Sequence, residues 1–202
     1  MQKGRLYVFS GPSGAGKSTI CRELVKDEQL KLSVSMTTRA PREGETDGVS
    51  YYFVSREKFQ QTIDEGGFLE HASIYNNSYG TPKAPVMAQL EQGYDVILEI
   101  EMQGAAQVKK SYPDAVLVFV LPASMKVLRE RLTARGTDSA EQVELRLSKS
   151  LEEIRTMVDY DYFLINDDLA QTLATGRAII TAGRHMVKEY SEEIIKQFEE
   201  EK

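Results

Sequence analysis

The sequence predicts an α/β fold of three layers, in which a parallel core sheet lies between two layers of helices. Short apolar runs suited to buried strands recur along the chain, and helical patterns separate most of them, as in a series of β-α-β units. These runs are residues 6–9, 95–100, 115–121 and 162–165. A stretch rich in Tyr, Thr, Gly and Arg breaks this rhythm between about residues 35 and 79. We therefore expect a single domain over residues 1–202 with a small β-rich insertion.

A glycine-rich turn directly follows the first strand-like run. It reads Gly11-Pro12-Ser13-Gly14-Ala15-Gly16-Lys17-Ser18, which is the G-x-x-x-x-G-K-[ST] pattern of the phosphate-binding P-loop. Helical spacing begins at Thr19 and continues to residue 25, so the turn has the strand before it and the helix after it that the motif requires.

The chemistry of this turn suits a triphosphate. Backbone N–H groups at the start of a helix, aided by the helix dipole, bind anions. Lys17 adds a mobile positive charge, and the Ser18 hydroxyl can ligate Mg²⁺. A glycine-rich turn that binds nothing is the weaker alternative, because a chance match in such a chain is expected roughly one time in a hundred. The sequence therefore predicts binding of a nucleoside triphosphate.

Helices are expected between and after the strands. Four are expected before residue 160, at 84–91, 104–110, 124–135 and about 139–157. Gly93 stops the first, the second ends before Pro113, and Gly136 follows the third. Ser139 and Gln142 form a capping box that opens the last of these. From residue 168 onward the chain is expected to be helical with pauses near Gly176 and Gly183, and to end in a solvated tail at 199–202. The insertion is expected to hold short antiparallel strands around a helix at 55–65.

Composition and charge narrow the class of protein. Hydrophobic residues make up 41% and charged residues 28% of the chain, which is ordinary for a soluble globular protein. The net charge of −6 argues against a general nucleic-acid or membrane surface. No stretch approaches the roughly 18 apolar residues of a membrane span, and the P-loop begins where a signal peptide would lie. We expect a cytoplasmic protein that binds small molecules.

The rarer reactive residues indicate structure rather than chemistry. Cys21 is the single cysteine, so no disulfide can form within the chain, and its place on the apolar side of the first helix predicts core packing. The only histidines, His71 and His185, have no partners that suggest a metal site. We expect both histidines to be structural.

Two arginines in the insertion can form an anion clamp. Arg39 and Arg42 lie three residues apart beside the turn-forming Pro41. The planar fork of arginine suits bidentate binding of phosphate, so two converging guanidinium groups would hold a monophosphate. A pair of solvated loop arginines is the competing interpretation.

Other polar residues of the insertion are equally open to two interpretations. Tyr51 and Tyr79 lie in β-rich segments, where tyrosine usually packs. Glu70 alternates with apolar residues and can be a solvent-facing strand residue. Residue types alone leave these positions undecided.

A pair of predicted helices carries further arginines. Arg131 and Arg135 lie four residues apart, on one face of the helix that starts near residue 124, and Arg146 follows on the next helix. Two helices joined at residues 135–137 can form a lid that brings arginines onto phosphates. Surface ion pairs with Glu130 or neighbouring residues are the alternative.

Two acidic residues end the strand at 95–100. Glu99 and Glu101 follow an apolar run, at the edge where an open α/β sheet binds ligands. Side chains alternate along a strand, so both point to the same face. We expect Glu99 to lie near the P-loop and to hold Mg²⁺ through water.

Taken in order, these segments resemble the guanylate kinase family. The matching segments are residues 11–19, 33–42, 44–45, 48–54, 68–70, 79–81, 98–104, 131–136 and 165–168. The P-loop alone is generic, but the run Ser33-Val34-Ser35-Met36-Thr37-Thr38-Arg39-Ala40-Pro41-Arg42 is specific to this family.

The resemblance implies a P-loop kinase fold with a nucleoside-monophosphate-binding insertion and a helical lid. The core would comprise about residues 1–34, 82–123 and 158–202, the insertion about 35–81, and the lid about 124–157. It implies transfer of the γ-phosphoryl group of ATP to GMP, giving ADP and GDP, with Mg²⁺ as cofactor. GMP and dGMP are both expected acceptors, because nothing obvious reads the 2′-hydroxyl.

The resemblance also implies a role for individual residues. ATP would bind residues 11–19, with Asn166 either on the adenine side or in contact with the lid. The GMP phosphate would bind Arg39, Arg42, Tyr51 and Tyr79, and the guanine would lie among Ser35, Glu70, Thr81 and Glu101. The transferred group would be stabilised by Lys17, Arg39, Arg131, Arg135 and Arg146. The family often has Asp where this chain has Glu101, one methylene longer, and some members have Ser where it has Thr81.

Guanine chemistry independently favours the role of Glu70. The base presents N1–H and N2–H₂ as adjacent donors, and an ionised carboxylate accepts both. Adenine presents an acceptor at N1, so the carboxylate would face a lone pair, a penalty that supports a preference on the order of 10²-fold or more. A hydroxyl from Ser35 or Thr81 can donate to O6.

Two other functions remain possible at this point. A protein-interaction module with the same fold would bind a phosphorylated peptide in place of GMP, but such modules generally have eroded P-loops, whereas Lys17 and Ser18 are present here. A related kinase acting on another phosphorylated acceptor, such as a ribosyl bisphosphate, would have little use for Glu70. The oligomeric state, monomer or homo-oligomer, is left open.

Overall fold

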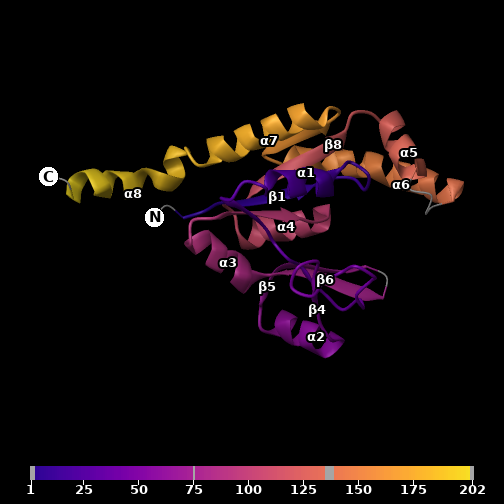
Figure 1. The fold of residues 1–202 in the computed structure, drawn as a ribbon, viewed down its shortest axis with the longest axis horizontal. Helices are drawn as coiled ribbons and strands as arrows, with labels where there is room; N and C mark the ends of the chain where they lie inside the picture. Colours follow the sequence, from indigo (N-terminus) through magenta and orange to yellow (C-terminus); the bar gives the residue numbers. More distant parts are fainter. Residues whose placement is uncertain (1–2, 75, 135–138, 201–202) are drawn as a thin grey trace.

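A computed structural model describes residues 3–74, 76–134 and 139–200. A parallel sheet forms the centre of the molecule, with the strand order β2-β7-β1-β8-β9 (Figure 1). These strands are β1 (Leu6–Ser10), β2 (Leu30–Leu32), β7 (Asp95–Glu99), β8 (Val116–Pro122) and β9 (Tyr162–Asn166). Because the strands are parallel, their carboxyl ends meet at one edge, where β1 leads into the P-loop and β7 ends at Glu99.

Helices cover both faces of this sheet and complete the three layers. On one face lie α1 (Lys17–Leu24) and α7 (Leu169–Gly183), and on the other α3 (Lys83–Glu91) and α4 (Met102–Ser111). Side chains alternate across β1, so that Tyr7 and Phe9 pack toward α1 and α7 while Leu6 and Val8 pack toward α3 and α4. The predicted three-layer α/β fold is confirmed.

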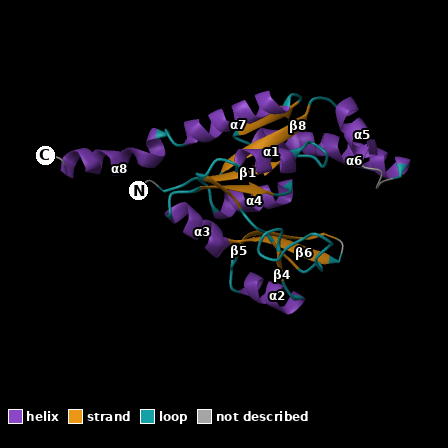
Figure 2. Ribbon diagram, viewed as in Figure 1, coloured by secondary structure: helices purple, strands orange, loops and turns teal. Residues whose placement is uncertain are grey.

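A second sheet lies beside the first (Figure 2), with the order β4-β3-β6-β5. Its strands are β3 (Met36–Thr37), β4 (Tyr52–Phe53), β5 (Phe68–Ile74) and β6 (Asn77–Pro82). The expectation of antiparallel strands holds for β3 with β6 and for β5 with β6, but is wrong for β3 and β4, which are parallel. The connection over residues 38–51 crosses back to the start of the sheet, so β4 runs in the direction of β3 rather than forming a hairpin with it.

The helix of this region packs beneath the second sheet. α2 (Arg56–Asp64) begins after Ser55, whose side chain accepts a hydrogen bond from the N–H of Lys58 at 3.2 Å. Phe59 of α2 stacks on Phe68 of β5 with ring centroids 4.7 Å apart. The predicted helix at 55–65 is confirmed within one residue at each end.

Two helices form a separate layer at the far end of the molecule. They are α5 (Met125–Ala134) and α6 (Ala140–Arg155), followed by the 3₁₀ turn η1 (Thr156–Asp159). The predicted capping box of Ser139 and Gln142 is present. A small cluster of apolar side chains holds the two helices together: Leu128, Leu132, Val143 and Leu147.

Two points of the sequence analysis need correction, a missed strand and a pause within a helix. The edge strand β2 was not expected, because its three residues include Lys31 and give no apolar run. The pause near Gly176 is wrong: α7 continues through this buried glycine, which packs against Leu24 of α1. The chain does turn at Gly183, the last residue of α7. Residues 199 and 200, the last that the structure describes, are exposed as expected and are still helical, because α8 (Val187–Glu200) continues to Glu200 and projects away from the sheet (Figure 1).

Candidate active site

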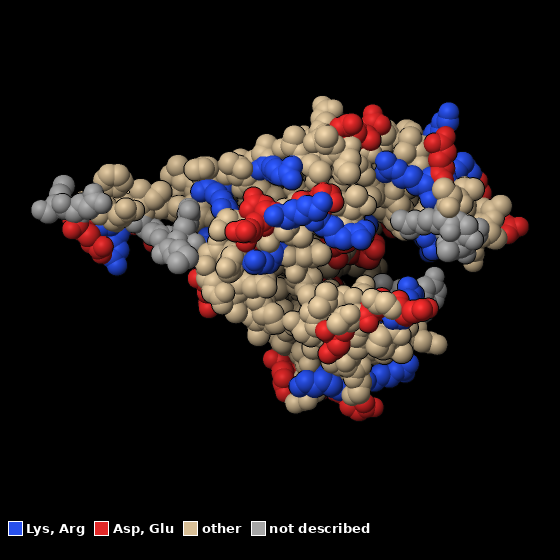
Figure 3. Space-filling model, in the orientation of Figure 1, with Lys and Arg blue, Asp and Glu red and all other residues tan. Residues whose placement is uncertain are grey.

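A cavity of about 400 Å³ separates the parallel sheet from the second sheet. The space-filling view shows the surface hollowed between these two parts of the molecule (Figure 3). Its walls come from the P-loop, the end of β7, the second sheet and the first turn of α4. They are Lys17, Ser18, Ser35, Tyr51, Glu70, Ala72, Tyr79, Glu99, Ile100, Glu101 and Gly104.

A second hollow, of about 330 Å³, lies around the outside of the P-loop. Ser13, Gly14, Gly16 and Thr19 line it. The two cavities share four residues: Lys17, Ser18, Glu99 and Glu101. Ligands in the two cavities would therefore meet at the P-loop lysine.

The P-loop has the backbone geometry that its glycines predict. Gly11, Gly14 and Gly16 have φ values of 141°, 94° and 99°, a region that residues with side chains rarely adopt. A Cβ at Gly16 would also lie 2.1 Å from Nδ2 of Asn166. Because Gly16 has no side chain to cap α1, the N–H groups of the first turn stay available for an anion.

Lys17 lies over the loop that it follows. Its ammonium group is buried and donates to the carbonyl of Gly11, and to that of Pro12 at 3.3 Å. This holds the side chain along the loop, with its charge in the wall of both cavities.

Ser18 and Glu99, which the sequence analysis predicts as oxygen ligands of Mg²⁺, lie in contact with each other. The Ser18 hydroxyl donates to Oε1 of Glu99, so a hydroxyl and a carboxylate from α1 and β7 meet at one point. In the described part of the chain, no three His, Cys, Asp or Glu side chains gather to form a metal site. The two oxygens fit Mg²⁺, which usually takes few protein ligands and fills its shell with water and substrate phosphate.

Arg131 and Asn166 meet at the base of the P-loop. The Asn166 amide donates to the Ala15 carbonyl at 2.7 Å, and Nη1 of Arg131 donates to the same oxygen at 3.2 Å. Nη2 of Arg131 donates to the Asn166 carbonyl at 3.0 Å. In this arrangement Arg131 supports the loop from the side of α5.

The other predicted lid arginines are less informative. Arg135 lies outside the described residues. Arg146 is partly buried on α6 and is not among the residues that line the two cavities.

The acceptor side of the cavity contains a buried carboxylate. Glu70 of β5 faces Thr81 of β6 across the antiparallel pair, and the Thr81 hydroxyl donates to Oε1 of Glu70 at 2.7 Å. Glu70 is 7% exposed and Thr81 is 1% exposed. Burial raises the pKa of Glu70, and the hydrogen bond from Thr81 opposes this shift. The cavity is therefore lined by a buried carboxylate that can accept hydrogen bonds, and the predicted role of Glu70 in binding guanine depends on such an acceptor.

The predicted phosphate clamp has an internal partner that sequence reasoning missed. Nη2 of Arg39 donates to Glu45 at 2.7 Å, and the other Glu45 oxygen accepts from the backbone N–H of Arg42 at 2.7 Å. The hydrogen bond to Glu45 raises the pKa of Arg39. Arg39 also lies over the Tyr51 ring, 5.5 Å from its centroid. The only sequence signal is an acidic residue three positions after Arg42.

The two tyrosines lie closer to the cavity than the arginines. Tyr51 and Tyr79 both line it, with ring centroids 6.0 Å apart and edge-on packing. The Arg39 and Arg42 side chains are not among the lining residues, and Arg42 is exposed. The structure therefore brings together the two tyrosines and the four residues predicted to surround guanine (Ser35, Glu70, Thr81 and Glu101), with Arg39 against Tyr51.

A further acidic residue near the site was also missed. Glu153 is half-buried near the end of α6; burial raises its pKa, the charge of Glu101 adds to this shift, and Lys17 opposes it. Its sequence environment, within a charged stretch of helix, gave no signal of this position.

The structural residues behave as expected where the structure tests them. Cys21 is fully buried in the core and burial raises the pKa of its thiol.

Within the described ranges, no helix combines the length and the apolar character needed to cross a membrane.

Comparisons with known proteins agree with this geometry. The family model described as "Guanylate kinase" matches residues 3–182. A guanylate kinase of Clostridioides difficile is 52% identical over 202 residues, covering 100% of this chain and 98% of the relative. One of Alkalilimnicola ehrlichii is 50% identical over 186 residues, covering 92% of each. The crystal structure of guanylate kinase from Anaplasma phagocytophilum matches with a TM-score of 0.75 and 32% identity, covering 94% of this chain and 90% of that one. A P-loop that faces a buried carboxylate across one cavity, together with these relatives, shows that the chain belongs to the guanylate kinase family.

Proposed function

We propose that this protein transfers the γ-phosphoryl group of ATP to GMP, giving ADP and GDP, with Mg²⁺ as cofactor. One observation carries the proposal: the hollow around the P-loop and the cavity that holds Glu70 meet at Lys17, Ser18, Glu99 and Glu101. A donor phosphate on one side and an acceptor phosphate on the other would meet beside the lysine. Membership of the guanylate kinase family supports the same reaction.

The donor side is built for a triphosphate. The open N–H groups at the start of α1 would bind the β- and γ-phosphates, and residues 11–19 would surround them. Asn166 would lie on the adenine side. Lys17 would leave the carbonyls of Gly11 and Pro12 in part to follow the transferred group, neutralising charge on its oxygens.

The acceptor side is built for a guanine nucleotide. Glu70 would accept from N1–H and N2–H₂ of the base, with Thr81 and Ser35 as hydroxyl neighbours and Glu101 beside the amino group. Tyr51 and Tyr79 line the cavity and would hold the GMP phosphate together with Arg39 and Arg42. For the arginines to reach it, Arg39 has to share its guanidinium between Glu45 and the phosphate, which its five donors allow.

Mg²⁺ would be held by the Ser18 hydroxyl and, through water, by Glu99. When bound, the ion supplies positive charge to the phosphate oxygens between the two nucleotides. Both residues line both cavities, so they are placed to serve the donor and the acceptor at once.

Residues 124–157 would act as a lid over the core, and residues 35–81 as the GMP-binding part. Closure would bring Arg131, Arg135 and Arg146 toward the phosphates and exclude water, which prevents hydrolysis of ATP. The proposal includes dGMP as an acceptor, a role in purine nucleotide metabolism and a cytoplasmic location, where both nucleotides are available.

The test is an ADP-release assay with ATP and Mg²⁺ against GMP, dGMP, AMP, CMP and UMP. Turnover confined to GMP and dGMP is the expected result and would support both the transfer and the role of Glu70. Absence of turnover with every acceptor, in a folded protein that still binds GMP, would overturn the proposal in favour of a binding module. Turnover with AMP equal to that with GMP would overturn the base assignment alone.

A further inference from the structure

Gly104 faces the carboxylate that is proposed to read guanine. It is buried in the first turn of α4 and, like Glu70, lines the cavity between the two sheets. A Cβ at this position would lie 2.7 Å from Oε2 of Glu70, 3.2 Å from its Cδ and 3.2 Å from Cδ1 of Ile100. Real Cβ contacts below 3.0 Å are essentially absent, so any side chain here would displace the carboxylate.

The Glu70 carboxylate is therefore held between two neighbours. On one side the Thr81 hydroxyl donates to Oε1 at 2.7 Å. On the other side Oε2 packs against the bare α-carbon of Gly104. A hydrogen bond and a missing side chain together fix where this carboxylate lies in the cavity wall.

The conflict at Gly104 is with the end of a side chain and not with backbone. A methyl group would push Glu70 and leave the course of α4 and β5 unchanged. This contrasts with Gly4, whose Cβ would lie 1.8 Å from the Tyr94 carbonyl, a backbone atom that cannot retreat. Substitution at Gly104 should thus alter the site while the fold survives.

We propose that Gly104 is a positioning residue for base selectivity: its lack of a side chain lets the Glu70 carboxylate lie where it can accept both N1–H and N2–H₂ of guanine. This inference rests on the proposed role of Glu70. For one carboxylate to accept two parallel hydrogen bonds from adjacent donors, its plane has to be aligned with the plane of the base. A displaced carboxylate keeps at most one good bond, so the selectivity falls while the phosphate contacts stay.

Gly176 offers a matched control. It is also a buried glycine within a helix, but a Cβ there would lie 3.5 Å from the nearest atoms of Leu24, an ordinary van der Waals distance. Gly176→Ala should therefore leave the fold and both Michaelis constants near their original values.

The experiment measures KM for GMP, IMP and ATP in the wild type, Gly104→Ala and Gly176→Ala. IMP lacks the 2-amino group and offers only N1–H. Gly104→Ala is expected to raise KM for GMP by about tenfold or more, to change KM for ATP less than twofold, and to reduce the preference for GMP over IMP. An unchanged KM for GMP and an unchanged preference in folded Gly104→Ala would overturn the inference.

A second variant tests whether the effect passes through Glu70. Shortening the carboxylate in Glu70→Asp/Gly104→Ala makes room for the methyl group, so the double variant is expected to bind GMP better than the sum of the two single effects predicts. Strictly additive effects would contradict the proposed contact. If Gly104→Ala does not fold but the double variant does, the contact is supported; if neither folds, Gly104 has a structural role and the inference fails.

These outcomes are separate from failure of the proposed function. The wild type alone tests whether GMP is an acceptor, and the ratio of variant to wild type tests Gly104. A wild type that phosphorylates GMP with a Gly104→Ala variant indistinguishable from it would refute only the positioning role.

Discussion

The donor side of the site consists mainly of backbone groups, whereas the acceptor side consists mainly of side chains. On the donor side a single continuous loop supplies backbone groups, held open by glycines with positive φ. On the acceptor side, side chains from the second sheet and from the segments that flank it converge, beside Gly104 of α4, which has no side chain. Backbone N–H groups bind any polyphosphate, whereas a buried carboxylate with a fixed position can discriminate between bases. The difference teaches that affinity for phosphate and selectivity for a base can be altered independently in this molecule.

The largest expected effect is at the junction of the two sides. Lys17→Ala should lower kcat by about 10² to 10³-fold, because the charge that follows the transferred phosphoryl group is lost. The effect should be the same with GMP and dGMP, since the proposed contacts of Lys17 are with phosphate groups and not with base or sugar. Steady-state kinetics and a melting curve measure it.

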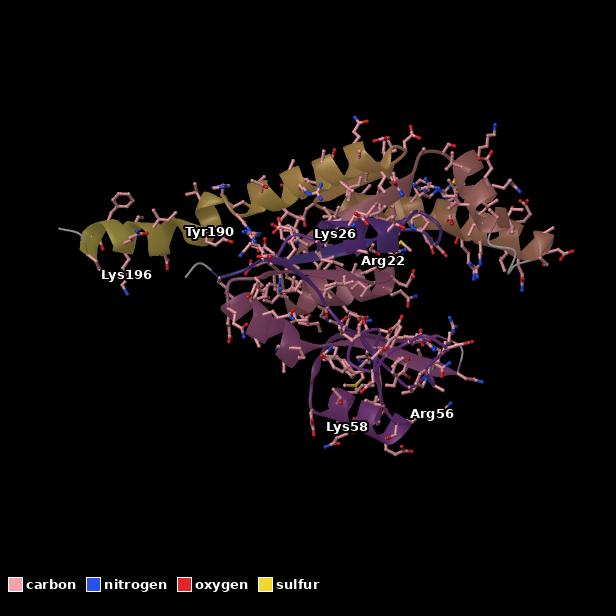
Figure 4. All side chains as sticks on the ribbon, in the orientation of Figure 1. Arg22, Lys26, Arg56, Lys58, Tyr190 and Lys196 are labelled. Carbon is pink, nitrogen blue, oxygen red and sulfur yellow. The ribbon has the colours of Figure 1, made fainter. Side chains whose placement is uncertain are left out.

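Lys26 provides the control for this lysine. It lies in the loop after α1 (Figure 4), its side chain is 68% exposed, and it forms an ion pair with Glu23. Lys26→Ala should retain full activity. A Lys17→Ala enzyme with full kcat would remove the lysine from the mechanism.

The next effect separates the two sides. Glu70→Gln should raise KM for GMP by about 10²-fold, because the amide nitrogen faces a guanine donor and the ionised acceptor is lost. KM for ATP should change less than twofold. Glu65→Gln, at an exposed position after α2, is the matched change without a site. Equal loss for both nucleotides would refute the role of Glu70 in base recognition.

A change of pH should act on the acceptor side alone. Burial raises the pKa of Glu70, so this carboxylate takes up a proton at higher pH than an exposed one and then cannot accept both guanine donors. KM for GMP should rise severalfold as the pH is lowered through the raised pKa of Glu70, while KM for ATP follows a flatter course. Profiles of the two constants in the wild type and in Glu70→Gln check this. The GMP phosphate itself titrates at about pH 6, so the contribution of Glu70 is the part of the rise that Glu70→Gln lacks.

The effect of the same group on folding has the opposite sign. A carboxyl whose pKa is raised in the folded state binds protons more tightly there than when unfolded. Its contribution to stability is present at low pH and is lost as the pH rises through the raised value. Weaker GMP binding at acid pH should therefore not come from Glu70-driven unfolding, and circular dichroism at each pH separates the two.

The smallest expected effect concerns support of the donor loop. Asn166→Ala removes the buried hydrogen bond to the Ala15 carbonyl and should lower the free energy of unfolding by about 1–2 kcal/mol. KM for ATP should rise a few-fold and KM for GMP little. Urea unfolding and kinetics measure both. Gln60→Ala, which removes an exposed bond to Asp64, should change stability by less than about 0.5 kcal/mol. A rise in KM for GMP alone would place Asn166 on the wrong side of the cavity.

The donor side could be predicted from the sequence because its determinants are local. One stretch, residues 11–18, contains the glycines, Lys17 and Ser18. The strand before it and the helix after it have recognisable apolar patterns. The edge strand β2 could not be predicted in this way, because Leu30, Lys31 and Leu32 are too few to show a pattern and gain their structure from pairing with β7.

The acceptor side could not be predicted from residue types, and the family resemblance supplied it. Glu70 becomes an acceptor rather than a surface residue only because β6 and α4 bury it. Glu45 and Gly104 belong to matching segments, but residue types do not reveal their contacts. The contact of Glu45 with Arg39 depends on how the loop between them turns, and that of Gly104 with Glu70 joins residues far apart in the chain. The parallel pairing of β3 and β4 was also missed, because each strand has two residues and so short a sequence does not indicate the direction in which a strand pairs.

The contact between Tyr190 and the start of the chain has a practical consequence. The Tyr190 hydroxyl donates to the Lys3 carbonyl at 3.4 Å (Figure 4), and β1 begins and α8 ends at the side of the molecule opposite α5 and α6 (Figure 1). A tether attached to either end would leave the cavity and the helices around it facing solution. The enzyme can therefore be immobilised by its termini, and a sensor surface could follow nucleotide binding without blocking access.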